Sequence, residues 1–580
     1  MDNEILIAEH VREKTDSVKF KERRFVQWNE NYALYRDKVA TNRLTQRQPV
    51  NIPIIRETIQ TWISKIDEAP KLSFEARDKG NAAKTSEIVF NEIYNFYYDK
   101  LKLDILDNLD KKIVGLQGRS FKKVGVSKRD VFIDIIDPYD IEIDPRCNPL
   151  DLNTAGYVIH THIFRSLKQI LANENYTAEG KNQLKMFLDS KEGIIQAATD
   201  LQSYQMRKER LQNLGVSNFD EYRAHDVLVE INESYKLVWN KESNSFVRHI
   251  ITIATDSVVL SNKPVKEAIG ITRLPIVSWA SDPDLNDIWS DGIADSVRTF
   301  NKVTNMYISQ DIENRSYRNF GMYFFNTMNG TFQPRAFDAK PFGMYGVPGN
   351  PSDIVKQMDI QPLSDTMPTI SWLKDLIQSS VAQTALERGE QQKGNSTLGE
   401  VQLSFKQSSG RNQVVSKNYR RAWKELGELF YDMFRANVTS SITLYKKGGD
   451  GSYYEKEAYP TDWITPKGYA VKVEIQAERE AASDFDLKKI QYIKNSFATN
   501  PAAINLAKRK ELELMNWTDE EIDAVMQAEN QAAPLNTIQA APDAANNPQD
   551  SVANTNKKSL TGGEVIPGAA GAMANQAVMK

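Results

Sequence analysis

The hydrophobic and polar positions of this chain change their period along its length. Over residues 2–39, aromatic side chains recur every three or four positions, which predicts an amphipathic helix. Helical periodicity continues at residues 55–66 and 81–112, and residues 121–280 show mostly the alternation of short strands, with helices again at 166–222. The stripe of the first helix is expected to be buried core and consists of Phe25, Trp28, Tyr32 and Tyr35.

The middle of the chain predicts two long helices separated by a compact insert. The first runs from Ile293 to about Asn319, roughly 40 Å at about 1.5 Å per residue, and Pro368 opens the second. Between them glycine and proline replace the helical pattern, and two short strands are expected, at residues 322–325 and 343–347. Because both helices carry a matching apolar stripe, we expect an antiparallel hairpin with the insert at its tip.

The other face of the first long helix is charged. We expect this face to be solvated, while the apolar stripe must pack on another surface, which can be a second copy of the chain. The charged face consists of Asp295, Arg298, Lys302, Asp311, Glu313, Arg315 and Arg318.

A polar loop and a very long helix follow the hairpin. Residues 386–396 lack apolar anchors after Leu386 and are expected to be mobile. Thr397 and Glu400 form a capping box for a helix that continues to Val438, with a kink expected near Gly410. A strand hairpin at 441–459, a strand at 470–475 and helices at 484–530 come next, whereas residues 531–580 are too poor in apolar side chains to form a core.

Composition narrows the class of protein. The 580 residues suggest about four packed units, and 41% hydrophobic and 26% charged residues are typical of a folded chain. With 73 basic and 77 acidic residues the net charge is −4, whereas a general nucleic-acid binder is basic. The lone Cys147 excludes an intrachain disulfide, and the lack of a signal sequence or a membrane span predicts a soluble protein.

The sequence contains no strong catalytic or metal-binding motif. It has no phosphate loop, no H-E-x-x-H and no G-x-S-x-G, so no enzymatic activity and no cofactor are expected. The acidic run that starts at Asp282 lacks the glycine and glutamate of a calcium loop, since Asp287 and Ile293 stand at these places. His160 and His162 are expected on one face of a half-buried strand, and a zinc site would need further ligands.

Three groups of residues, together with the order of the elements, resemble a known family. The groups are Pro49-Val50-Asn51-Ile52 before the helix to Pro70, the strand pair 137–145 and 155–159, and Asp291-Gly292-Ile293 opening the helix that holds Asn301 and Asn305. Over most of residues 20–530, the chain resembles the portal proteins, or head-to-tail connectors, of tailed bacteriophages. None of these residues is a catalytic signature.

The resemblance implies an α+β portal fold, and the chain is expected to have eight parts. Seven of these are an N-terminal wing (1–285), stem helix 1 (286–319), an α/β clip (320–365), stem helix 2 (366–385), a channel or tunnel loop (386–397), a long kinked helix with C-terminal wing strands (398–483) and a helical crown (484–530). The eighth part, a low-complexity tail at 531–580, lies outside the resemblance and is expected from its composition to be disordered.

The resemblance also implies where DNA and protein partners bind. The channel loop would make weak contacts with the DNA backbone that ignore base sequence, and a near-neutral to acidic ring would keep such contacts sparse. The loop residues in question are Glu387, Arg388, Glu390, Gln391, Gln392, Lys393 and Asn395. The clip residues expected to contact partners are Tyr323, Asn326, Arg335, Asp338 and Lys340.

The implied function is that of a ring, usually of twelve subunits, at one vertex of the virion capsid. A separate terminase would pack double-stranded DNA through it, the genome would later leave through it, and the major capsid protein and adaptor or tail proteins would bind it. The protein would be made in the host cytoplasm and would not contact a membrane.

Two alternatives remain from the sequence. The first is another phage structural protein, such as a baseplate or scaffold component, without a DNA channel. The second is a DNA-processing enzyme that uses the D-x-K of Asp338 and Lys340, although the Pro-Asp pair before it, Pro283-Asp284, lies across a long helix.

Overall fold

The computed structural model describes a large part of the chain. It covers residues 3–37, 50–66, 70–127, 130–192, 228–241, 243–320, 323–325, 355–357, 360–363, 365–381, 398–447, 453–474, 490–492, 501–514 and 525. The chain forms two compact units, Met1–Ala498 and Thr499–Lys580. The second unit contains the helix α15 (Pro501–Leu514).

Helices and strands are both abundant, which confirms the predicted α+β class at this level. The helices of the first unit are α1 (Asn3–Tyr35), α2 (Ile54–Lys65), α3 (Asn81–Lys100), α4 (Leu103–Gln117), α5 (Leu167–Ala172), α6 (Ala178–Leu188), α8 (Val265–Ile269), α9 (Ile293–Phe320), α11 (Thr366–Ser380), α12 (Leu398–Asn437) and α13 (Pro460–Trp463). Two short 3₁₀ helices are η1 (Pro138–Asp140) and η2 (Leu152–Thr154).

The strands pair antiparallel throughout the described residues. They are β1 (Lys71–Ala76), β2 (Arg119–Ser127), β3 (Asp130–Ile136), β4 (Ile141–Ile143), β5 (Tyr157–Ser166), β6 (Leu228–Asn240), β7 (Ser245–Ala254), β8 (Val258–Pro264), β9 (Ile276–Ala280), β10 (Tyr323–Phe325), β11 (Val355–Gln357), β12 (Ile442–Lys447), β13 (Tyr453–Ala458) and β14 (Tyr469–Glu474). The larger sheets have the orders β3-β2-β9 and β4-β5-β6-β7-β8, and β1-β14, β10-β11 and β12-β13 are two-stranded.

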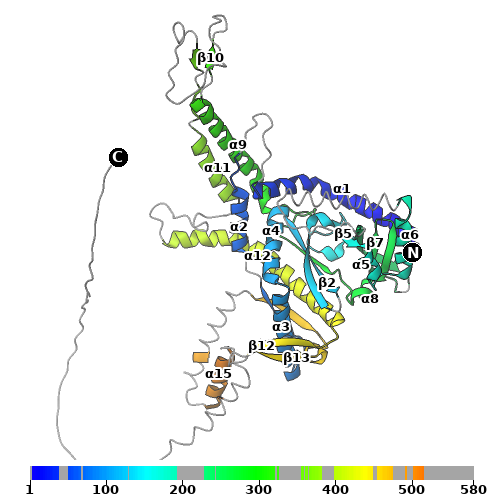
Figure 1. Cartoon of the computed structure of the whole chain (residues 1–580). Coiled ribbons are helices and arrows are strands. Elements are labelled where there is room, and N and C mark those ends of the chain that lie inside the picture. Colours follow the sequence, from blue (N-terminus) through cyan, green and yellow to red (C-terminus); the bar gives the residue numbers. More distant parts are fainter. Residues whose placement is uncertain are drawn as a thin grey trace, which may run out of the picture. The chain divides into compact units, whose positions relative to one another are not determined.

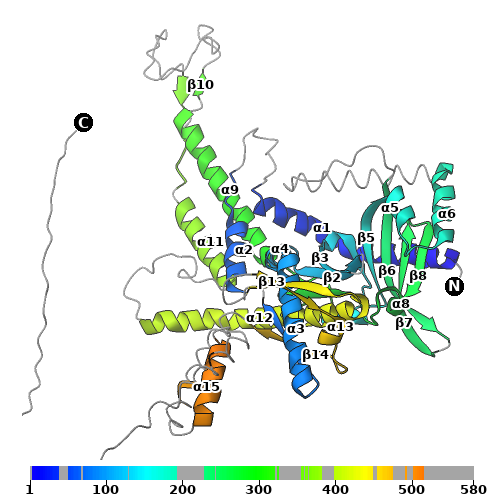
Figure 2. The same ribbon diagram turned by 60° about the horizontal axis from the view of Figure 1, so that its bottom comes forward.

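The long helix α12 lies at the centre of the main hydrophobic core. It packs on β2, β3, β9 and β14, as the ribbon in Figures 1 and 2 shows. Aromatic rings dominate this contact, and Trp423, Phe430 and Phe434 of α12 are almost completely buried. Burial of such large rings contributes strongly to the stability of the contact between α12 and these strands.

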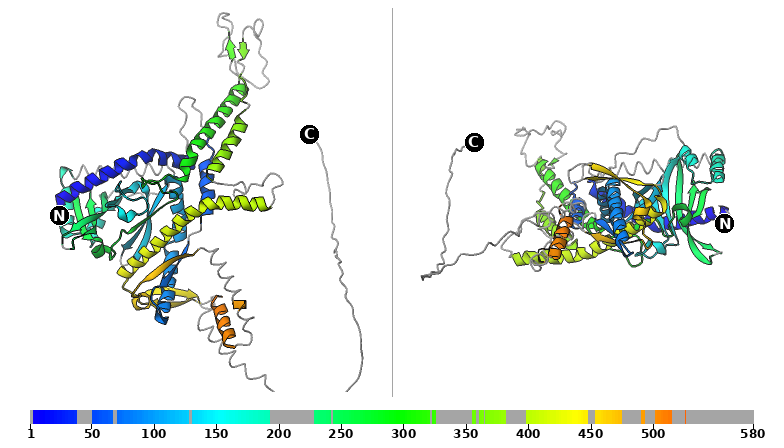
Figure 3. Two further views of the ribbon diagram at one scale, coloured as in Figure 1. Left: turned by 180° about the vertical axis from the view of Figure 1, so that it is seen from behind. Right: turned by 90° about the horizontal axis from the view of Figure 1, so that it is seen from below.

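Helix α1 connects the five-stranded sheet with the base of α9, a course that is visible from behind in Figure 3. At its start, Leu6 packs against Ile251 and Ile253 on one face of the sheet. Helices α5 and α6 cover the other face, where Ile170 and Leu184 are buried. The sheet is thus enclosed on both faces by helices.

Several predicted elements are confirmed, some with shifted boundaries. The helices predicted from Ile293 and from Pro368 are α9 and α11, the long helix is α12, and the predicted strand hairpin is formed by β12 and β13. Strand β10 was predicted, but its partner β11 was not. The strand predicted at 343–347 and the helix end predicted at 382–385 lie outside the described residues.

Three predictions about the N-terminal half are wrong. Residues 81–112 form two helices instead of one, because Lys102 adopts a left-handed conformation with φ of 51° and caps α4. A β-bulge between His160 and Ile163, with His162 at φ of 56°, interrupts the alternation that would place both histidines on one face. Of the aromatic stripe on α1, Trp28 is buried, but Tyr32 and Tyr35 are only half-buried.

Candidate functional site

Helices α9 and α11 pack side by side and form a hairpin that leaves the core (Figure 1). Antiparallel strands β10 and β11 close it at the end away from α2, with Tyr323 paired to Gln357 and Phe325 to Val355. This arrangement agrees with the predicted antiparallel hairpin whose tip carries a small insert.

Two asparagines of α9 fix the base of the hairpin to the chain before α2. The amide oxygen of Asn305 accepts a hydrogen bond from the backbone N–H of Ile52 at 2.9 Å. Asn301 accepts one from the N–H of Ile55 at 3.3 Å and donates one to the carbonyl of Ile52 at 3.2 Å. Since Pro53 provides no side-chain cap for α2, Asn301 satisfies a free N–H of its first turn from another helix.

The sequence alone points to the residues on both sides of this contact, but it does not show that they lie next to each other. Asn51 and Ile52, as well as Asn301 and Asn305, were among the residues that carry the family resemblance, and the side chains of Asn51 and Asn305 are hydrogen-bonded. The available signal was the pair of amides four residues apart, beside an apolar stripe of α9. Asn301 is completely buried, and a buried amide requires hydrogen-bond partners.

The charged face predicted to be solvated instead packs on α1 over its first turns. Arg298 lies 2.8 Å from Asp295 and 3.5 Å from Glu30, and both Arg298 and Asp295 have largely buried side chains. Asn31 of α1 donates to Asp295 at 3.0 Å and to the carbonyl of Leu116 at 2.9 Å. These contacts join α1, α4 and α9, so the prediction of a solvent-facing surface is wrong here.

The start of α9 is also tied to α1 through arginine. Arg24 donates to the carbonyl of Trp289 at 2.6 Å and forms ion pairs with Asp287 and Asp291. Asp287 belongs to the acidic run that superficially resembled a calcium loop, and it binds Arg23 as well. The run therefore serves as an anchor for the arginines of α1.

Where α4 ends and α9 begins, the two backbones pass each other at close range. An added Cβ on Gly118 would lie 1.8 Å from the carbonyl oxygen of Ser290, and one on Gly292 would lie 2.7 Å from that of Gly115. Side chains at these two glycines would separate the segments. The end of α4 and the start of α9 are therefore packed so closely that only glycine fits at these two positions.

Beyond this base, the hairpin carries large apolar side chains in contact with solvent. Met367 and Trp372 of α11 are 65% and 60% exposed, and Met306 and Ile312 of α9 are also exposed. Tryptophan and methionine are enriched in the buried centres of protein interfaces. In the described part of the chain these side chains contact solvent, and exposed apolar surface of this kind marks interaction sites.

Of the residues predicted to contact DNA and other proteins, the described part of the chain includes Tyr323 alone. Tyr323 lies in β10, where its backbone pairs with β11. The other predicted positions lie outside the described residues, namely Asn326, Arg335, Asp338 and Lys340 of the clip and Glu387, Arg388, Glu390, Gln391, Gln392, Lys393 and Asn395 of the channel loop.

Ionisable groups with shifted pKa values have structural partners in the core. Burial acts to raise the pKa of Glu233, but the charges of Lys123 and His160 outweigh it and hold the pKa at about 2. Burial raises the pKa of Asp107, and its ion pair with Lys111 offsets part of this effect. These shifts result from pairs that hold strands and helices together.

The described residues contain neither a metal-binding cluster nor a membrane-spanning helix. Within them, no three His, Cys, Asp or Glu side chains are grouped as a metal site. His160 lies 3.5 Å from Lys123, and His162 lies 3.2 Å from Asp140. None of the helices in this part of the chain combines the length and the apolar character of a membrane span.

Comparison of the chain with protein-family models finds no match, and comparison with curated proteins finds none either. The geometry of the hairpin and the order of the elements are therefore the basis for a functional proposal.

Proposed function

We propose that this protein is a portal-type subunit that assembles into a ring around a channel for double-stranded DNA. In this proposal a separate terminase drives DNA into the capsid through the ring, and the genome leaves by the same route. The major capsid protein and adaptor or tail proteins bind the outside of the ring. The ring itself is a structural component of the virion at one vertex of the capsid.

The observation that carries this proposal is a long hairpin that polar contacts hold at its base and that exposes large apolar side chains beyond it. Asn301, Asn305 and Arg298 hold α9 on the core, whereas Met367 and Trp372 are exposed. A fixed orientation relative to the core is required if many copies are to close into one ring. Exposed apolar side chains then gain their partners from neighbouring subunits.

The position of α12 supports the same proposal. Its C-terminal half is buried in the main core, and its N-terminus follows the channel loop directly in sequence. The loop thus precedes, in sequence, a helix whose C-terminal half is buried in the main core. The net charge of −4 fits a channel that lets DNA pass without holding it, since phosphate neutralisation by many cations would increase affinity.

The first test is the size and shape of the purified protein. We expect sedimentation and negative-stain imaging at micromolar concentration to show rings with a mass many times the 65.9 kDa of the subunit. The same imaging separates the alternatives, because a baseplate or scaffold component would give no ring with a central channel. A stable monomer under these conditions contradicts the proposal.

The second test concerns the loop between α11 and α12. We expect the double substitution Arg388→Ala and Lys393→Ala to reduce packaged DNA per particle severalfold while rings still form, because two cations that can contact phosphates are lost. A matched control removes the exposed cations Lys185 and Lys266, on α6 and α8, in the same way. Equal packaging by the loop variant and the control would argue against a DNA-contacting loop.

A further inference from the structure

Helix α4 leaves two large apolar side chains in contact with solvent while it buries three charged ones. Ile105 and Leu109 are 64% and 52% exposed, whereas Asp107, Asp110 and Lys111 are buried beside Leu103, Val114 and Leu116. A helix at the surface of a single folded chain normally directs its large apolar side chains to the core and its carboxylates to water. Ile105 and Leu109, one turn apart, therefore form an exposed apolar surface of the kind that binds a partner.

Specific contacts fix this orientation of α4. Asp107 accepts a hydrogen bond from the hydroxyl of Tyr419 at 2.6 Å and pairs with Lys111 at 2.7 Å. Asp110 accepts one from the indole N–H of Trp279 at 2.6 Å and pairs with Lys122 at 2.5 Å. Rotation of α4 to bury Ile105 and Leu109 would break the contact of Asp107 with Tyr419 and those of Asp110 with Trp279 and Lys122.

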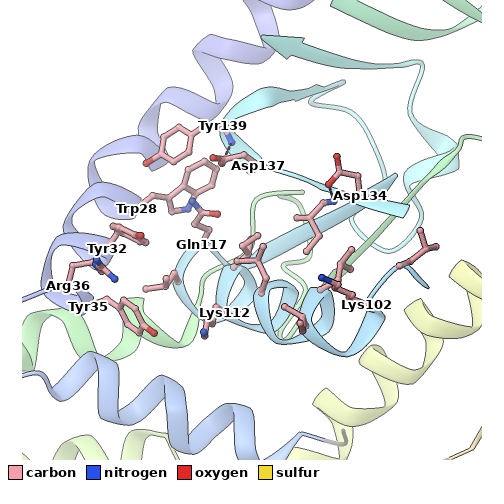
Figure 4. A pocket seen from close by; sticks show the side chains of 17 residues that line it. Trp28, Tyr32, Tyr35, Arg36, Lys102, Lys112, Gln117, Asp134, Asp137 and Tyr139 are labelled. Atoms are coloured by element: carbon pink, nitrogen blue, oxygen red, sulfur yellow. Dashed lines mark hydrogen bonds between the residues drawn. The ribbon is translucent and has the colours of Figure 1, made fainter. Parts of the chain in front are cut away.

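The exposed face of α4 forms one wall of an open pocket of about 640 Å³, shown in Figure 4. Trp28, Tyr32 and Tyr35 of α1 form another wall, and Ile135 and Tyr139 form a third. Charges of both signs occur at its margin, which consists of Arg36, Lys102, Lys112, Asp134 and Asp137. An apolar centre with a polar rim is the usual anatomy of a protein interface.

We propose that a second copy of this chain fills this pocket and covers the outward face of α4. The inference rests on the proposed ring, because it assigns one of the contacts between neighbouring subunits. A ring closes through two different surfaces of each subunit, so the pocket requires a complementary projecting surface elsewhere on the same chain.

The position and the apolar lining of the pocket favour a second copy. Tyr32 and Tyr35 pack against the same cluster that contains Val297 of α9 and Ile377 of α11, so the pocket adjoins the base of the hairpin. The outer part of α9 presents exposed Met306 and Ile312. These apolar side chains of the same chain match the apolar centre of the pocket.

The test is a charge introduced into the exposed face of α4. We expect Leu109→Asp and Ile105→Asp to convert rings into monomers at micromolar concentration, with unchanged circular dichroism, since both positions are exposed in the single chain. Met186→Asp is the control, because Met186 is 74% exposed on α6, away from the pocket lining, and should leave the rings intact. Rings formed by both α4 variants as readily as by the wild type overturn this inference and leave the portal proposal standing.

A crosslinking measurement identifies what lies in the pocket. With p-benzoylphenylalanine in place of Leu109 in assembled rings, irradiation should give a species of twice the subunit mass, with the modified peptide drawn from α9. A crosslink confined to the same subunit, or a small molecule released from the pocket by denaturation, would show that no second copy fills it. Absence of rings in the wild-type protein would instead contradict the portal proposal itself.

Discussion

Replacing Gly118 with alanine is expected to lower the free energy of unfolding by about 3 to 5 kcal/mol and to reduce ring assembly strongly. Gly118 has a φ of 87°, where a side chain is disfavoured by about 1 to 2 kcal/mol. Its Cβ would also lie 1.8 Å from the carbonyl oxygen of Ser290 and 2.9 Å from the carbonyl carbon of Asp291. Backbone atoms cannot move aside as a flexible side chain can, so the two segments must separate.

Chemical denaturation followed by tryptophan fluorescence measures this loss, and sedimentation measures assembly. Gly115→Ala is the matched control, because its Cβ would make ordinary 3.4 Å contacts with Ile59 and Trp62 and because alanine favours the helix over glycine by up to about 1 kcal/mol. We expect the control to be neutral or slightly stabilising. Equal stability of the two variants would show that the joint between α4 and α9 tolerates movement.

The effect on assembly has a structural reason. Gly118 ends α4 and faces the segment from which α9 begins, next to the arginine contacts of Asp287 and Asp291. A displacement of this segment changes the direction in which α9 leaves the core. Because α9 is roughly 40 Å long, a small rotation at its base moves its far end by several ångströms.

Sequence periodicity predicted the secondary structure best for long elements whose ends are marked by capping or turn residues. Helix α12 was predicted from the capping box of Thr397 and Glu400 and from the helical pattern that continues to Val438, and its C-terminal half buries Trp423 and Phe430. The hairpin of β12 and β13 was predicted from its glycine-rich turn between two strands. Local sequence determines such elements because helix periodicity, caps and turn residues indicate the same structure.

Features that depend on tertiary contacts were not predictable in this way. The break at Lys102 and the buried carboxylates Asp107 and Asp110 follow from how α4 packs on α12 and β9, and the local pattern read as one continuous helix. The buried pair Asp295 and Arg298 looked solvated because its partners on α1 are more than 260 residues away in sequence. Long-range pairing of polar groups has no periodic signature along one chain.

The candidate site was predictable only in outline. The two helices of the hairpin and their mutual packing were predicted from matching stripes, whereas the asparagine contacts at the base join positions about 250 residues apart. The DNA-contacting role of Arg388 and Lys393 and the partner-binding role of the clip residues stay predictions, because those positions lie outside the described part of the chain.

Lys21→Met is expected to destabilise the protein by about 3 to 5 kcal/mol, because it leaves a buried carboxylate without its partner. The ammonium of Lys21 is completely buried and donates to the carbonyls of Tyr139 and Ile141 at 2.9 Å each and to Glu142 at 2.5 Å. Burial lowers the pKa of Lys21 and raises that of Glu142, although each group opposes the shift of the other. This pair holds the middle of α1 on β4 and η1.

Two further variants separate the loss of the pair from the burial of an unpaired charge. In Lys21→Met/Glu142→Gln no buried charge remains, so a large part of the loss should be recovered in urea denaturation, while three backbone carbonyls still lack their donor. Arg12→Met breaks an exposed pair with Asp16 on the same helix and should cost less than about 0.5 kcal/mol. Strictly additive effects of the two substitutions at 21 and 142 would contradict a coupled pair.

Since α1 connects the five-stranded sheet with the base of the hairpin, Lys21→Met should also weaken ring assembly, and the double variant should restore part of it.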